Sequence, residues 1–298
     1  MDKKRLLVVG GTGFLGKHIL KKGVQLGFKS HSISLKIPKG KLKIKGVKYL
    51  SLDIRNKKNL NTIKDKFQYV VNVSGYGGFN KNYRDSKNSD AQFTGLKNLA
   101  AFFLNKKIKK FIQIGSSLEY GKNKSPNKEN MITNNPLTEY GKLKLNSTIY
   151  LKLLYKFFNF PTVTFRLYQV YGPEQKNNRL IGYIINSIKK NKRIYVSKGE
   201  QIRDFLYVSD FVDAIFLALK KKNIDGEIFN IGYGKGYKVK EVIDNILKLF
   251  PNKKTISISL SKDNKKELKI LYPNINKAKR YLNWQPKISL IEGLKRLI

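Results

Sequence analysis

The chain has 298 residues, of which 41% are hydrophobic, so it can bury the core of one large domain or of two closely packed ones. It contains no cysteine and only two histidines, which excludes disulfides and thiolate catalysis and leaves almost no ligands for a metal. The formal net charge of +41 comes from lysines spread along the whole length rather than from an arginine-rich cluster, so we expect no specific nucleic-acid partner.

The first 170 residues alternate apolar runs with segments of helical spacing. Apolar runs bounded by turn residues predict strands at residues 5–11, 30–35, 47–54, 68–75, 109–117 and 161–170. Helices are expected at residues 14–27, 59–67 and 95–108, and in a segment that carries Tyr140 and ends near residue 158. This alternation favours a parallel sheet with helices on both faces.

The alternation of predicted strands and helices is less regular after residue 171. Helices are expected at residues 181–190 and 239–250, and a strand at residues 227–232. We therefore predict an α/β protein with a larger domain at residues 1–170. A smaller α/β domain at residues 171–298 should partly interleave with it and bind the substrate.

A glycine-rich turn separates the first strand from the first helix. Gly10, Gly13 and Gly16 follow the G-x-x-G-x-x-G spacing, which permits close approach of a pyrophosphate to a helix N-terminus. This position indicates a Rossmann-type, doubly wound domain that binds NAD(P). The cofactor contacts expected from the turn are Gly10, Thr12, Gly13, Phe14, Leu15 and Gly16.

The residues after the second strand bear on the choice of dinucleotide. An NAD site usually has an acid about twenty residues beyond the glycines, but no acid lies between Asp2 and Asp53. Ser34 and Lys36 offer a hydroxyl and a cation that suit the 2′-phosphate of NADP. We expect NADP(H) to be preferred, with NAD(H) possible. Asp53 and Ile54 end the third strand and are expected near the adenine, although Asp53 could equally cap a helix.

Tyrosine followed four residues later by lysine is a proton-transfer pair in some reductases. With 17 tyrosines and abundant lysine, roughly three such pairs should arise by chance. The sequence holds three, at Tyr83/Lys87, Tyr120/Lys124 and Tyr140/Lys144. The spacing alone therefore identifies no site.

The surroundings of Tyr140 single it out. Ser116 ends a predicted parallel strand on the cofactor side of the sheet, and Tyr140 and Lys144 share one face of the next helix. The lysine cation would favour the phenolate and hold the nicotinamide ribose. Ser116 would then bind the substrate oxygen while Tyr140 transfers its proton. Tyr83 follows no such strand, and Tyr120 is followed by loop residues.

Seven segments together resemble the extended short-chain dehydrogenase/reductases, the NAD(P)-dependent epimerase/dehydratase group that acts on nucleotide sugars. They are "GGTGFLG", "SSLEYG", "YGKLK", "RLYQVYGPEQ", "GEQIRDFLYVSD", "FNIG" and "LNWQPKISLIEGL", and they span the chain. The resemblance implies a nucleotide-diphosphate sugar as substrate and a homodimer. With no apolar stretch near the roughly 18 residues of a membrane span, we expect a cytoplasmic protein without integral membrane association.

The resemblance also assigns residues. Val170 would border the nicotinamide, and Trp284 is expected in the core. The substrate contacts expected in this way are Ser116, Ser117, Gln169, Arg179 and Arg203, with the two arginines on the diphosphate. In the family that this chain resembles, asparagine is usual where Gln169 stands, and also in the fourth helix, where this chain has Gln92.

Two residues discriminate within the family. Sugar 4,6-dehydratases carry an acid where Leu118 stands, and Glu119 is one place off. The 3,5-epimerase/reductases use a cysteine there. We therefore expect an enzyme that reduces a nucleotide-linked 4-keto-6-deoxyhexose at C4 with NADPH, as in the synthesis of surface polysaccharide. The alternatives are a UDP-glucose 4-epimerase-like enzyme with retained NAD and, more remotely, a noncatalytic dinucleotide- or RNA-binding relative.

Overall fold

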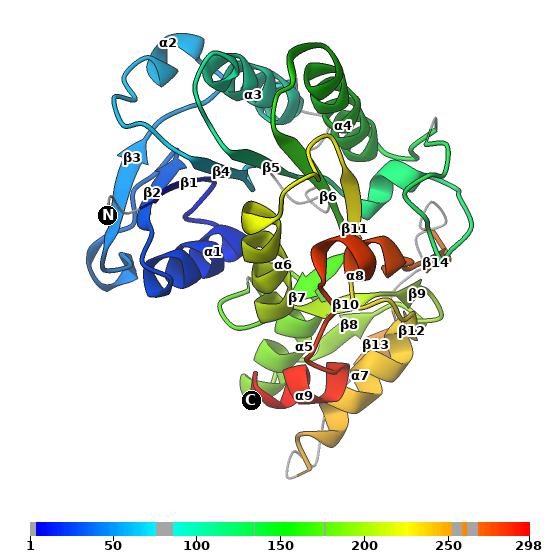
Figure 1. The fold of residues 1–298 in the computed structure, drawn as a ribbon. Coiled ribbons are helices and arrows are strands. Elements are labelled where there is room, and N and C mark those ends of the chain that lie inside the picture. Colours follow the sequence, from blue (N-terminus) through cyan, green and yellow to red (C-terminus); the bar gives the residue numbers. More distant parts are fainter. Residues whose placement is uncertain (1–3, 76–85, 134, 176, 252–257, 261–267) are drawn as a thin grey trace.

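A parallel sheet of seven strands forms the centre of the larger half of the molecule (Figure 1). The structure is a computed structural model, and it describes residues 4–75, 86–133, 135–175, 177–251, 258–260 and 268–298. The strands are β1 (Arg5–Val9), β2 (Lys29–Ser34), β3 (Val47–Ser51), β4 (Tyr69–Asn72), β5 (Lys110–Ile114), β6 (Thr162–Leu167) and β11 (Ile228–Ile231). Their order is β11-β6-β5-β4-β1-β2-β3, and every neighbouring pair is parallel. The predicted doubly wound sheet is confirmed.

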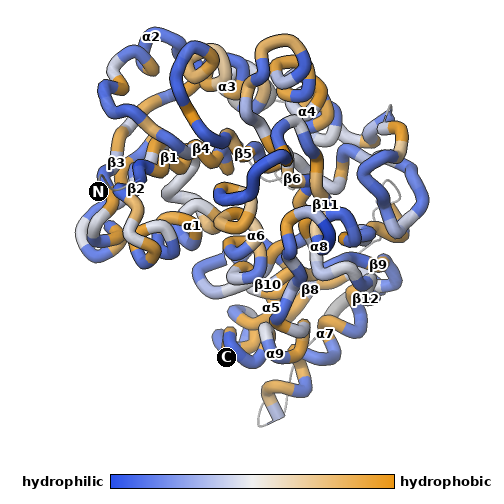
Figure 2. The backbone as a smooth tube through the Cα atoms, viewed as in Figure 1, coloured by the Kyte–Doolittle hydropathy of each residue, from blue (hydrophilic) through white to orange (hydrophobic). Residues whose placement is uncertain are grey.

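Helices cover both faces of this sheet. They are α1 (Phe14–Gln25) and α6 (Val208–Lys220) on one face, and α3 (Ser86–Leu104) and α4 (Glu139–Phe158) on the other. In β1, Leu6 and Val8 belong to the first hydrophobic cluster, whereas Leu7 and Val9 belong to the second. Because both faces are covered, the strand is a continuous apolar run instead of an alternating one. Figure 2 shows apolar residues concentrated in these central strands.

The second half of the chain adds shorter elements below the main sheet in Figure 1. Its helices are α5 (Leu180–Lys189), α7 (Val239–Lys248), α8 (Asn276–Leu282) and α9 (Leu290–Lys295). Its strands are β7 (Gln169–Tyr171), β8 (Ile194–Val196), β9 (Ile202–Arg203), β10 (Phe205–Tyr207), β12 (Tyr237–Lys238), β13 (Ile258–Leu260) and β14 (Ile270–Leu271). They form the small sheets β10-β7, β12-β9-β14 and β13-β8. Two elements of this half, β11 and α6, return to the larger half.

Three predicted elements differ from the structure. The helix expected at residues 95–108 is α3, which begins nine residues earlier, at Ser86, and ends at Leu104. The helix expected at residues 59–67 is a single turn, α2 (Lys57–Leu60), and it is followed directly by Asn61 and Thr62, two residues of low helix propensity. The strand expected at residues 161–170 divides at Tyr168. Its first part, β6, pairs in the main sheet, and its second part, β7, pairs with β10 instead.

Trp284 lies in the core, as predicted, and is 3% exposed. Its indole Nε1 donates a hydrogen bond of 2.9 Å to the carbonyl oxygen of Asp210 at the start of α6. The contact holds the C-terminal segment against the larger half. Within the described ranges, no helix is long and apolar enough to cross a membrane.

Candidate active site

The glycine turn between β1 and α1 is packed too closely to admit a side chain at two of its glycines. Gly10 has a φ of +85°, and a Cβ there would lie 2.9 Å from the backbone of Ser74. A Cβ on Gly16 would lie 2.6 Å from the Cα of Gly11. Helix α1 begins after Gly13 and has no acid in its first turn, so its positive end is unopposed. The tight turn and the free helix end are compatible with a bound pyrophosphate, and the contacts predicted for Thr12, Phe14 and Leu15 stay predictions.

The end of β2 lies beside this turn. The hydroxyl of Ser34 accepts a hydrogen bond of 3.3 Å from the backbone N–H of Thr12 and donates one of 2.8 Å to the carbonyl of Ile33. Lys36, two residues further, is exposed. Ser34 thus helps to hold the turn, and the proposed contact of Lys36 with a 2′-phosphate stays a prediction.

Asp53 is bound by a neighbouring arginine. The guanidinium of Arg55 donates hydrogen bonds of 2.6 and 3.0 Å to its carboxylate, and these bonds lower the pKa of Asp53. Ile54 is 8% exposed and packs in the second hydrophobic cluster. Their predicted position near the adenine is not tested, but the carboxylate already has a partner.

Ser116, Tyr140 and Lys144 come together at the end of β5. Ser116 caps the short 3₁₀ helix η3 (Ser117–Tyr120), and its hydroxyl accepts a hydrogen bond of 3.2 Å from the N–H of Leu118. Helix α4 starts beside it and places Tyr140 in its first turn. Lys144, one turn later, donates a hydrogen bond of 2.7 Å to the carbonyl of Ile114, and its Nζ lies 5.7 Å from the Tyr140 ring centroid.

The environment shifts both titratable groups. Burial raises the pKa of Tyr140 to about 12, while the charge of Arg179 and a hydrogen bond with the Ser116 hydroxyl oppose this shift. Burial lowers the pKa of Lys144 to about 8, and the charge of Glu119 opposes this shift. The charge of Arg179 thus favours the phenolate form of Tyr140. The same effect expected of Lys144, whose Nζ lies near the Tyr140 ring, stays a prediction.

The rival pair Tyr120/Lys124 lacks these features. Tyr120 is 2% exposed, and its hydroxyl donates a hydrogen bond of 2.7 Å to Asn230. Lys124 is exposed in the following loop. Tyr83 lies outside the described residues. Of the two pairs whose tyrosine is described, only the Tyr140 pair lies beside Ser116.

The residues after Ser116 have separate surroundings. Leu118 is half-buried against an apolar cluster that contains Tyr120. Glu119 is fully buried, and its carboxylate accepts hydrogen bonds from the backbone N–H of Ser116 at 2.8 Å and from Nε of Arg166 at 2.9 Å. Glu119 therefore does not share the direction of Leu118, as we expected.

The predicted substrate residues divide into two groups. Arg179 is the N-cap residue of α5 and acts electrostatically on Tyr140. Arg203 is 5% exposed and donates hydrogen bonds to the carbonyls of Ile202, at 2.8 Å, and Leu268, at 2.6 Å. The structure thus brings Arg179 to the Tyr140 site and places Arg203 against backbone carbonyls of the smaller half.

The remaining predicted contacts lie on β7 or in η3. Gln169 and Val170 are half-buried in β7, and the carbonyl of Val170 accepts a hydrogen bond of 2.7 Å from the side chain of Gln175. Ser117 is buried in η3. Gln92 is buried in α3 next to Gly75. Their contacts with a sugar stay predictions.

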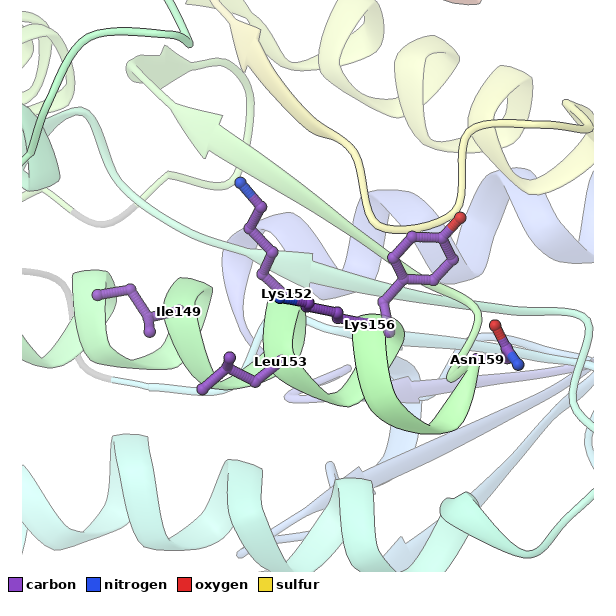
Figure 3. Close-up of a pocket in the computed structure, with 6 residues that line it drawn as sticks. Ile149, Lys152, Leu153, Lys156 and Asn159 are labelled. Carbon is purple, nitrogen blue, oxygen red and sulfur yellow. The ribbon is translucent and has the colours of Figure 1, made fainter.

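A shallow hollow lies on the outer face of α4, away from these residues (Figure 3). It is lined by Ile149, Lys152, Leu153, Tyr155, Lys156 and Asn159. The apolar side chains of Ile149 and Leu153 are 48% and 46% exposed. None of the lining residues belongs to the Tyr140 site.

Comparisons with known proteins agree with this geometry. The model of the NAD dependent epimerase/dehydratase family matches residues 6–232. The UDP-glucuronate 4-epimerase of Thermodesulfobacterium geofontis is 28% identical, with 98% of this chain and 94% of the relative covered. A putative UDP-glucose 4-epimerase of Methanocaldococcus jannaschii is 30% identical, with 98% and 97% covered. Among solved structures, the UDP-glucose 4-epimerase of Thermotoga maritima with UDP-glucose superposes with a TM-score of 0.90 at 26% identity, covering 98% of this chain and 96% of that one.

The family match covers most of the chain, including the glycine turn and the Ser116, Tyr140 and Lys144 site. The homologues are enzymes that act on nucleotide sugars. The chain belongs to the NAD dependent epimerase/dehydratase family.

Proposed function

We propose that this enzyme interconverts C4 epimers of a UDP-linked hexose or hexuronic acid. The observation that carries the proposal is the Ser116, Tyr140 and Lys144 cluster, which can move one proton and bind one oxygen. The neighbouring carboxylate of Glu119 is buried and bound to Ser116 and Arg166. Such a set suits redox chemistry at a single carbon. The named activities of the relatives support C4 as the reacting carbon and UDP as the nucleotide of the substrate.

This proposal replaces our first expectation, a 4-ketoreductase, with the alternative. A reductase consumes its cofactor, whereas an epimerase returns the hydride to the opposite face of the same carbon. The relatives that span nearly the whole chain carry the names of 4-epimerases. The reductase stays the second candidate because Lys36 and the missing acid after β2 favour an exchangeable NADP(H).

The residues can be given roles. When bound, the nicotinamide of the cofactor accepts and returns a hydride. Ser116 donates a hydrogen bond to the C4 oxygen, and Tyr140 takes the hydroxyl proton as C4 is oxidised and gives it back as C4 is reduced. Lys144 has three N–H donors and uses one on Ile114, which leaves two for the nicotinamide ribose. Arg179 helps to keep the phenolate form accessible.

The same proposal assigns the cofactor and the substrate to the two halves of the chain. Residues 1–170 would bind the dinucleotide, and residues 171–298 would supply most contacts to the nucleotide diphosphate. Arg179 and Arg203 are the proposed diphosphate ligands, since a guanidinium matches phosphate oxygens.

A homodimer is also part of the proposal. Ile149, Leu153 and Phe157 are spaced four residues apart on α4 and are 48%, 46% and 65% exposed, so they form an apolar stripe on the outer face of the helix. A second copy would bury this stripe against itself around a two-fold axis. Sedimentation of the wild type and of Leu153→Glu tests this: the variant should be monomeric and the wild type dimeric.

The assay for the function has two arms. UDP-glucose, UDP-galactose and UDP-glucuronate are each incubated without added cofactor, and C4 epimers are separated by chromatography. A 4-keto-6-deoxy nucleotide sugar is offered separately with NADPH or NADH. The epimerase proposal expects epimers in the first arm without net cofactor change. Cofactor oxidation in the second arm alone would establish the reductase instead.

A further inference from the structure

A buried carboxylate lies directly behind Ser116. Glu119 is fully buried, and both of its oxygens accept hydrogen bonds. Oε1 accepts from the backbone N–H of Ser116 at 2.8 Å, and Oε2 accepts from Nε of Arg166 at 2.9 Å. The hydroxyl of Thr148 lies 2.9 Å from Oε2. Burial raises the pKa of Glu119, and the guanidinium of Arg166 opposes this shift.

These contacts connect three elements of the site. Ser116 follows β5, Arg166 belongs to β6, and Thr148 lies on α4 one turn after Lys144 and two turns after Tyr140. Thr148 also hydrogen-bonds the carbonyl of Lys144 at 3.1 Å. The carboxylate of Glu119 therefore joins the serine to the helix that carries the tyrosine and the lysine.

The residue that follows β5 is a glycine, which leaves space for this carboxylate. A Cβ on Gly115 would collide with Oε1 of Glu119. The Ser116 side chain and Glu119 form a capping box around η3, in which the serine hydroxyl accepts from Leu118 and the carboxylate accepts from Ser116. Ser116 is thereby held in one orientation, with its hydroxyl hydrogen-bonded to Tyr140.

From these contacts we infer that Glu119 is a positioning residue, which fixes Ser116 relative to the α4 helix that carries Tyr140 and Lys144. The inference rests on the proposed chemistry at C4. Glu119 itself is sealed from substrate, so it transfers no proton in the reaction. Its effect is on the distance and alignment between the groups that bind and protonate the C4 oxygen.

Glu119→Gln tests the positioning role directly, because glutamine has the same shape as glutamate. Both carboxylate oxygens face N–H donors, so either orientation of the amide places its NH₂ group against a donor. We expect kcat to fall by at least about tenfold, since small misplacements of catalytic groups are costly. The KM for the sugar and the Kd for the dinucleotide should change by less than about threefold, because Glu119 touches neither ligand.

The pH profile separates positioning from a plain charge effect. Within the described part of the chain, the groups that act on Tyr140 include Ser116 and Glu119 from the η3 segment, Lys144 from its own helix, and Arg179 from the start of α5. The Ser116 hydrogen bond lowers the pKa of Tyr140, and the Glu119 charge raises it by less. If the variant loosens Ser116, the pKa of Tyr140 should rise, and the rate of sugar oxidation should increase at a higher pH than in the wild type. If Glu119 acted only through its charge, the pKa of Tyr140 would fall and the rate would increase at a lower pH. That result would overturn the inference.

Two further variants act as controls. Thr148→Val removes the link to α4 and should also lower kcat, whereas Thr148→Ser keeps the hydroxyl and should restore it. Asp210→Asn neutralises another buried carboxylate, which accepts a 3.0 Å hydrogen bond from Ile288 N–H far from Tyr140, and should leave kcat and the pH profile unchanged. If Glu119→Gln and Thr148→Val lower only the melting temperature, Glu119 has a purely structural role.

Failure of the proposed function gives a different result. A wild type without activity on any nucleotide sugar would refute the proposed C4 chemistry, but it would not test whether Glu119 positions Ser116. Crystal structures of the wild type and of Glu119→Gln then decide the inference. It expects the Ser116 hydroxyl to move away from Tyr140 in the variant, and an unchanged Ser116 position would overturn it.

Discussion

The ammonium nitrogen of Lys144 lies 2.7 Å from the carbonyl oxygen of Ile114, the last residue of β5, and donates a hydrogen bond to it. This bond ties the first turns of α4 to the edge of the sheet where the glycine turn also lies. Lys144 is 5% exposed, so its charge is largely removed from water. Its position therefore has consequences for stability as well as for the reaction.

Stability should depend on pH through Lys144. Its pKa is about 8 in the folded protein, below the ordinary value of 10.5, because of burial. Between these two values the unfolded chain binds more protons than the folded one, so the unfolding free energy should rise with pH across this window. In Lys144→Met this contribution is absent. Urea denaturation of both proteins from pH 7 to pH 10.5 measures the difference, which should grow in favour of the wild type; a flat difference would contradict the lowered pKa.

Tyr140→Phe should lose nearly all turnover, by roughly 10² to 10⁴-fold, because only the transferable proton is removed. Dinucleotide binding, measured by calorimetry, should stay close to that of the wild type. Tyr120→Phe is the matched control, since Tyr120 is buried and bonded to Asn230. It should lose stability but keep most of its turnover. Equal turnover losses in the two variants would remove the proposed role of Tyr140.

Gly16→Ala should abolish dinucleotide binding. Its Cβ would lie 2.6 Å from the Cα of Gly11, so the glycine turn could not keep its present path. Gly27→Ala is the control, because Gly27 has a φ of +79° but no atom within 4 Å of a new Cβ. It should cost about 1 kcal/mol of stability through backbone strain and leave binding intact. Calorimetric titration with NAD and NADP tests both variants.

Lys36→Ala should weaken NADP more than NAD. Lys36 follows β2 and is exposed, and the chain has no acid between Asp2 and Asp53 to bind a ribose hydroxyl. A loss of one phosphate contact should reduce NADP affinity by about tenfold and leave NAD affinity nearly unchanged. The measurement compares four dissociation constants, those of the wild type and of Lys36→Ala for NADP and for NAD. Tighter binding of NAD than of NADP by the wild type would show that the missing acid is a poor guide here.

Local sequence was enough to find the glycine turn and the Tyr140 site. Glycine spacing at a strand–helix junction and a helical i, i+4 pair are short-range patterns. The role proposed for Glu119 could not be predicted from local sequence, because its partner Arg166 is 47 residues away, on β6. The approach of Arg179 to Tyr140 also depends on how α5 packs. The best signal for Glu119 was the capping box that it forms with Ser116, three residues before it.

The last prediction concerns dehydration. Forming a 4-keto-6-deoxy sugar requires an acid/base beside C5 and C6. In the dehydratases that this chain resembles, an acid stands where this chain has Leu118. Leucine cannot exchange a proton, and the neighbouring carboxylate of Glu119 is bound to Arg166 and Ser116. UDP-glucose or dTDP-glucose incubated with the enzyme and either dinucleotide should therefore give C4 epimers at most. The absorbance of a 4-keto-6-deoxy product in alkali measures the competing reaction.

Leu118→Asp provides the comparison, because it places an acid at that position while the buried Glu119 carboxylate and its partners are left in place. Accumulation of the 4-keto-6-deoxy product by the wild type would mean that another group reaches C5, and that the significance given to Leu118 is wrong.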